Sequence, residues 1–136
     1  MKELPYMKKN RLADVLALIQ VLALYKHAFR TQSGITEEFQ GEPISAESWL
    51  HVAREHQEFF RVREGKGVEI SLIARYAQEN HAPLDPGYTA KLMETAIKIH
   101  DSQLNSSRWW TFWMPVIGAF LGGLLAIFFT KGSSSF

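Results

Sequence analysis

The residues best suited to chemistry lie in the segment His51–His56, HVAREH, which holds two imidazoles and a carboxylate. Imidazole and carboxylate side chains are common zinc ligands. Helical zinc motifs place their two His four residues apart, so that both rings face one ion. His51 and His56 are five residues apart, about 140° around a helix. We therefore expect two structural His residues and no metal site.

No other set of residues has the spacing of a catalytic site. His27, His81 and His100 are scattered along the chain, and none falls in a pattern with Ser and an acid. The chain contains no Cys, which excludes a disulfide framework, a thiolate zinc site and a cysteine nucleophile. We predict that the protein is not an enzyme and uses no cofactor.

Three basic residues, Arg61, Arg63 and Lys66, form a second candidate site, because Arg and Lys contact the phosphates of nucleic acids. The surrounding charge opposes this interpretation. Residues 31–60 hold six Glu and a single Arg, and the region before Trp109 carries equal numbers of basic and acidic residues. This charge balance argues against a nucleic-acid partner. DNA binding is therefore only the alternative function.

Two helices are expected before these basic residues. The first lies between Lys9 and Phe29 and is apolar on most sides, which predicts a central position among several neighbours. Residues 31–44 contain two Gly and one Pro and are interpreted as a loop with at most one helical turn or a short strand. The second helix follows Ser45 as its N-cap and has four residues on one face, namely Trp49, Val52, Ala53 and His56.

The period then changes from 3.6 to 2. Phe60 and Val62 alternate with Arg61 and Arg63, residues 64–67 form a turn, and a second alternating run follows over residues 68–72. This pattern predicts a β-hairpin. Asp85 followed by Pro86 then predicts the start of an amphipathic helix over residues 85–107. We assign residues 1–84 to a helical domain with one hairpin and residues 85–107 to a helix that connects it to the next segment.

Residues 45–75, SAESWLHVAREHQEFFRVREGKGVEISLIAR, resemble the later part of a winged-helix domain. The resemblance implies an α+β fold, and winged helices often read DNA with the helix before the hairpin. Here that helix carries Glu47, Glu55 and Glu58 against Arg54, the wrong sign for phosphate. With its C-terminal apolar segment, the chain is also similar to small bacterial membrane proteins of unassigned function, which implies a location and no activity.

The segment Trp109–Thr130 is 22 residues long and contains no charged side chain. A helix of that length is roughly 33 Å long, enough to cross a bilayer. We predict a transmembrane helix over residues 108–130 and a short tail over 131–136. Its expected interface residues are Arg108, Trp109, Trp110 and Trp113 on one side and Lys131 on the other.

Orientation follows from the flanking charges. Basic residues are more numerous before this segment than after it, which places the N-terminal domain on the cytoplasmic side. The N-terminus does not have the pattern of a signal peptide. We therefore expect a tail-anchored, single-pass protein of the bacterial inner membrane, with the lipid bilayer as its first partner.

Gly118, Gly122 and Ala126 lie four residues apart on one face of this segment. Small residues at this spacing let two membrane helices approach closely. Two interpretations stay open: a homodimer through the transmembrane helix, or small residues that face lipid. The expected function is protein-protein interaction or self-association by the small cytoplasmic domain, and the alternative is a membrane-tethered winged-helix regulator that binds DNA.

Overall fold

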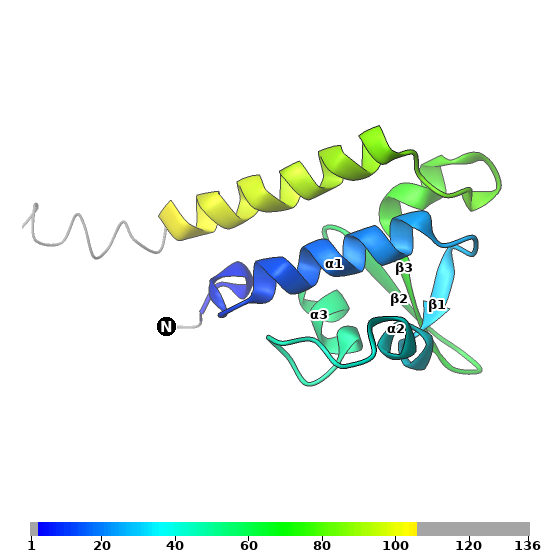
Figure 1. Cartoon of the computed structure of the whole chain (residues 1–136), viewed down its shortest axis with the longest axis horizontal. Coiled ribbons are helices and arrows are strands. Elements are labelled where there is room, and N and C mark those ends of the chain that lie inside the picture. The colour runs from blue at the N-terminus through cyan, green and yellow to red at the C-terminus, as the bar shows by residue number, and fades with distance from the viewer. Residues whose placement is uncertain (1–2, 106–136) are drawn as a thin grey trace, which may run out of the picture.

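The computed structural model describes residues 3–105 and combines helices with a three-stranded antiparallel sheet (Figure 1). The elements are η1 (Pro5–Met7), α1 (Arg11–Leu24), β1 (Phe29–Thr31), α2 (Gln32–Phe39), α3 (Trp49–Glu55), β2 (Phe60–Glu64), β3 (Val68–Leu72), η2 (Ile73–Ala77), η3 (Glu79–His81) and a helix over residues 86–105. The predicted α+β class is therefore confirmed. The predicted transmembrane helix lies outside the described residues.

Helix α1 lies in the middle of the fold, as its apolar surface predicts. The helix over residues 86–105 covers one side of it, and α3 and the sheet lie on the other (Figure 1). The core therefore has contributions from every layer. Its fully buried residues on α1 are Val15, Leu18, Ile19, Leu22 and Ala23.

The predicted hairpin is present as β2 and β3, with Phe60 opposite Leu72 and Val62 opposite Ile70. Strand β3 also pairs with β1, so the hairpin is part of a three-stranded sheet with the order β1-β3-β2. The sequence prediction missed β1, because a strand of three residues is too short to show a period of two. The added strand gives the hairpin the third strand that an independent sheet needs.

The expectation of a loop over residues 31–44 is wrong in its first half, where α2 forms. Thr31 caps this helix, since its Oγ1 accepts a hydrogen bond from Gly34 N at 3.0 Å. Ile35 is completely buried, and Phe39 lies against Trp49 with ring centroids 4.6 Å apart. These tertiary contacts stabilise a short helix whose polar composition gives little signal by itself.

Helix α3 buries the predicted face, but its N-cap is Ser48 and not Ser45. Ser48 Oγ accepts from His51 N at 3.2 Å, while Ser45 takes part in a different set of contacts. The helix that starts at residue 86 has the predicted cap, because Asp85 Oδ1 accepts from Tyr88 N at 2.8 Å. This helix packs on α1 through Ala96 and leaves Ile97 40% exposed.

Candidate functional site

The two His residues of the HVAREH segment have separate partners. His56 is completely buried, with Nδ1 3.0 Å from Glu58 Oε1 and Nε2 3.3 Å from Arg11 Nη1. The His51 side chain is half exposed, and its Nε2 lies 3.3 Å from Glu55 Oε1. Within residues 3–105, no group of three or more metal-ligating side chains is arranged to hold an ion.

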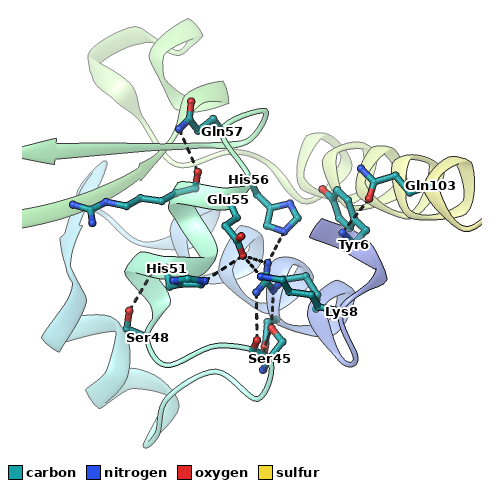
Figure 2. Close-up of polar contacts among 12 residues, drawn as sticks. Tyr6, Lys8, Ser45, Ser48, His51, Glu55, His56, Gln57 and Gln103 are labelled. Carbon is teal, nitrogen blue, oxygen red and sulfur yellow. Dashed lines mark hydrogen bonds and ion pairs between the residues drawn. The ribbon is translucent and has the colours of Figure 1, made fainter. Parts of the chain in front are cut away.

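Arg11 is the centre of a polar cluster that joins α1 to the segment before α3 and to α3 itself. Figure 2 labels three of its partners, Ser45, Glu55 and His56. Its side chain is completely buried. Nε donates to Ser45 Oγ at 2.8 Å, and Nη1 donates to Glu55 Oε1 at 2.7 Å. Asp14 accepts from the backbone N of Ser45 at 2.6 Å and from its hydroxyl. We call Arg11, Asp14, Ser45, Glu55 and His56 the Arg11 cluster.

The ionised state of the acidic groups follows from these contacts. Partial burial alone would raise the pKa of Glu55, but hydrogen bonds from Lys8 and Arg11 outweigh that effect and lower the pKa to about 2. The pKa of Glu58 is also lowered, because hydrogen bonds from His56 and Tyr6 outweigh the effect of burial. Burial, together with the hydrogen bond to Glu58, raises the pKa of Tyr6. Carboxylates with these partners compensate the buried guanidinium.

The polar atoms of the Arg11 cluster form hydrogen bonds to one another, which limits the reactions that this cluster could catalyse. The hydroxyl of Ser45 is bound by Asp14 and Arg11, so neither ring of His51 or His56 is its partner. Within this cluster, the Ser45 hydroxyl is therefore paired with a carboxylate and not with a His base. The sequence showed this cluster only through Arg11 and Asp14, two charged residues on an otherwise apolar helix.

A second buried guanidinium, that of Arg75, binds only backbone oxygens. Its side chain is completely buried, and it donates to the carbonyls of Leu22 at 2.9 Å, His27 at 3.0 Å and His81 at 2.7 Å. Further bonds reach Tyr25 and Lys26. Burial lowers the pKa of Arg75. Arg75 thus satisfies the free carbonyls at the end of α1 and is separate from the exposed basic residues of the hairpin.

The candidate nucleic-acid residues Arg61, Arg63 and Lys66 are exposed on the hairpin. Arg63 pairs with Glu69 at 2.5 Å and lies over the ring of Phe29, 3.6 Å from its centroid. The guanidinium of Arg61 lies 5.8 Å from the ring centroid of Tyr76. Among the described residues, Arg61 and Lys66 have no carboxylate within ion-pair distance. The structure therefore brings the two Arg residues to one face of the sheet and partly neutralises them.

A surface hollow of about 580 Å³ lies beside β2. Arg54 and Gln57 border it on the α3 side, and Arg54 forms an ion pair with Glu64. The remaining lining residues come from β2 and from the residue after β3, namely Phe60, Arg61, Val62, Glu64 and Ile73. This hollow was not expected from the sequence, because it depends on how the end of α3 packs beside the hairpin, which periodicity does not predict.

The other candidate residues lie outside the part of the chain that the structure describes. They are the interface residues Arg108, Trp109, Trp110, Trp113 and Lys131 and the small residues Gly118, Gly122 and Ala126. Within residues 3–105, no helix is both long and apolar enough to cross a membrane. Comparison of the chain with protein-family models, curated protein sequences and solved structures found no match.

Proposed function

We propose that the protein is a single-pass membrane protein whose N-terminal domain binds another protein on the cytoplasmic side. The membrane location is supported by the charge-free segment Trp109–Thr130 and by the excess of basic residues before it. The helix over residues 86–105 runs along α1 (Figure 1) and reaches the last described residue, close in sequence to that segment. The domain is thereby held close to the bilayer by a helix that is part of its own core.

We infer a winged-helix-like fold for this domain. The element order α1-β1-α2-α3-β2-β3 and the sheet order β1-β3-β2 support this proposal, because a helix followed by a two-stranded hairpin is the pattern that residues 45–75 share with winged helices. In this arrangement α3 is the helix before the hairpin, and β2 with β3 is the wing. Winged helices serve both nucleic-acid and protein contacts, so the fold alone does not choose between them.

The observation that favours a protein partner is the pairing of the exposed cations with carboxylates. Arg54 of α3 pairs with Glu64 of the hairpin, and Arg63 pairs with Glu69. Phosphate binding draws its energy from cations that release counterions, and paired cations contribute less of it. Beside these ion pairs lies the hollow, whose lining combines the polar residues Arg54, Gln57, Arg61 and Glu64 with apolar ones, and such mixed surfaces occur in protein contacts.

The test has a topological and a binding part. A reporter fused after Phe136 should be active only outside the cytoplasm, and a reporter before Met1 only inside it. A photoreactive amino acid at exposed positions of the domain, such as Ile44, Leu24 or Glu64, should form adducts with a protein in the native membrane. A cytoplasmic C-terminal reporter contradicts the topology, and a lack of adducts at all positions contradicts the interaction.

The second candidate function is a membrane-tethered DNA-binding regulator, which Arg61 and Lys66 favour because they have no carboxylate partner among residues 3–105. The measurement is salt-dependent binding of a DNA duplex by the full chain in detergent. Loss of binding on changing Arg61, Arg63 and Lys66 to Ala would support a regulator. No binding at low salt would eliminate it.

A further inference from the structure

Strand β2 is an edge of the sheet, and the direction of its free backbone groups follows from the pairing. Ile73 N donates to Phe59 O at 2.8 Å, and Gly65 N donates to Gly67 O at 3.1 Å. Because hydrogen-bonded pairs alternate along an antiparallel ladder, Arg61 and Arg63 also bond to β3. Val62 and Glu64 alternate with these bonded residues, so their N–H and C=O groups point away from the sheet.

Among residues 3–105, the backbone hydrogen bonds outside the ladder do not involve the N–H of Val62 or Glu64, and the phase of the pairing leaves both N–H groups out of the β2–β3 ladder. Free edges of this kind accept an extended segment as an additional strand, about 4.8 Å from the last one. We call the outward-facing backbone of β2, from Phe60 to Glu64, the β2 edge. It is five residues long, which is the ordinary length of a strand.

The hollow beside β2 provides space for the side chains of such a segment. Its apolar surface comes from Phe60, Val62 and Ile73, and the Ile73 side chain is 40% exposed. Arg54 and Gln57 border the opposite side. Side chains of an added strand alternate between two faces, so every second one would enter this hollow. Apolar residues fit where these side chains lie beside Val62 and Ile73, whereas Arg54, Gln57, Arg61 and Glu64 make the rest of the lining polar.

The other face of the β2 edge carries positive charge. Successive side chains of a strand point to opposite faces, so Arg61 and Arg63 lie on the face opposite Val62. Arg61 has no carboxylate partner among residues 3–105, and Lys66 in the adjoining turn has none either. Acidic residues on the matching face of an added strand would complete these pairs.

The same charges oppose pairing with a second copy of this chain. Two antiparallel β2 strands centred on Val62 would place Arg61 opposite Arg63 of the other copy. A pair centred instead on Arg61 or on Arg63 would place that residue opposite its own equivalent. Like charges directly opposite each other destabilise a strand pair. The charge pattern therefore favours a different, acidic partner.

We propose that the β2 edge binds an extended segment of a partner protein in which apolar residues alternate with Asp or Glu, as an added strand of the sheet. This inference rests on the proposed interaction function and names the chemistry of the partner. Arg61, which has no carboxylate partner among residues 3–105, then recognises a carboxylate of that segment, while Arg63 already pairs with Glu69. The hollow takes the apolar side chains, and the backbone of Val62 and Glu64 forms the strand pairing.

The experiment titrates the full chain in detergent micelles with a synthetic eight-residue peptide of alternating Val and Glu, followed by amide NMR and hydrogen exchange. The amides of Val62 and Glu64 should exchange more slowly with the peptide bound. Those of Arg61 and Arg63, already bonded to β3, should not change. A peptide with Lys in place of Glu should bind at least about tenfold more weakly. Equal exchange at Val62 with and without peptide overturns the proposal.

Two variants test the backbone and the charges separately. Val62→Pro removes an N–H that the fold does not use, which an edge strand tolerates, and should abolish the protection at Glu64. Val62→Thr keeps the N–H and is the matched control. Changing both Arg61 and Arg63 to Glu should reverse the preference, so that the Lys peptide binds more tightly than the Glu peptide. This variant tests the charge prediction even if Val62→Pro does not fold.

Other occupants give different results, each of which overturns the proposal. Slower exchange at Val62 that depends on protein concentration without peptide would identify a second copy. Protection of the hairpin by a DNA duplex, and not by the peptide, would identify nucleic acid. If photoadducts in the native membrane form from Leu24 or Ile44 and the peptide leaves β2 unchanged, this inference fails and the proposed function stands. If no position forms an adduct, the proposed function fails.

Discussion

Arg11 is a buried charged residue whose hydrogen-bond partners come from distant parts of the chain. A buried guanidinium is costly unless its hydrogen-bond donors are paired, and Arg11 has Ser45, Glu55 and His56 as partners. These partners are 34 to 45 residues away in sequence. Spacing therefore could not reveal them, because helical spacing relates only residues within a few turns. The same spacing did correctly place His56 on the buried face of α3.

Glu55 leads to a prediction about pH. The pKa of Glu55 is about 2 in the folded protein and 4.5 for the free side chain, so folding favours the ionised form. The contribution of Glu55 to stability is complete above about pH 4.5 and is lost as the pH falls toward about 2. Glu55→Gln should therefore lower stability near pH 7 and make the acid-induced loss smaller than in the unchanged protein.

The measurement for Glu55 is urea unfolding of the domain at a series of pH values between 7 and 2, with the two proteins compared at each. Glu47→Gln is the matched control, because Glu47 is exposed on the same part of the chain and forms no ion pair within residues 3–105. An acid-induced loss of the same size in the Glu55→Gln variant would show that Lys8 and Arg11 do not stabilise the ionised carboxylate.

At the scale of elements, Arg75 connects η2 to the end of α1. Five backbone carbonyls, those of Leu22, Tyr25, Lys26, His27 and His81, accept from this one side chain. Arg75→Met keeps much of the volume and removes the donors. Each buried carbonyl left without a partner costs about 1–3 kcal/mol, so we expect a loss of at least about 3 kcal/mol in the free energy of unfolding.

Hydrogen exchange should locate the effect of Arg75→Met. Amides from Leu22 to Thr31 should exchange faster, while those in the middle of α3 should follow the global stability. Arg61→Met is the matched control, because it removes an exposed Arg from the neighbouring strand and should leave the same amides unchanged. Equal effects of the two substitutions would show that the carbonyl contacts of Arg75 do not hold the end of α1.

The elements differ in how far the sequence could predict them. Helix α3, the hairpin and the helix from residue 86 have a clear period or cap and were predicted within a few residues. Strand β1 and helix α2 were not, because they are short and depend on Ile70, Trp49 and the buried Ile35 for their stability. The hollow beside β2 was missed for the same reason, since its walls come together only when the hairpin packs beside α3.

At the scale of the whole molecule, the position of the N-terminus relates the fold to the proposed anchor. Tyr6 N donates to Gln103 Oε1 at 3.0 Å, which fixes η1 beside the last turns of the helix over residues 86–105. Figure 1 shows η1 and this end of the helix at one end of the molecule, and the turn between β2 and β3 toward the other. A segment that enters the bilayer from residue 109 would therefore leave η1 near the lipid and the β2 edge away from it.

This arrangement predicts which residues lie near lipid headgroups. In nanodiscs that contain lipids with spin-labelled headgroups, the full chain should show strong broadening of amide signals over residues 4–10 and 99–105 and weak broadening over residues 62–70. Tyr6→Ala should change this pattern little, because α1 still packs on the helix over residues 86–105 through Ala96. Broadening that is strongest at the β2–β3 turn would place the hairpin on the membrane, and the β2 edge would then be blocked from the partner segment that its free backbone and its two Arg residues fit.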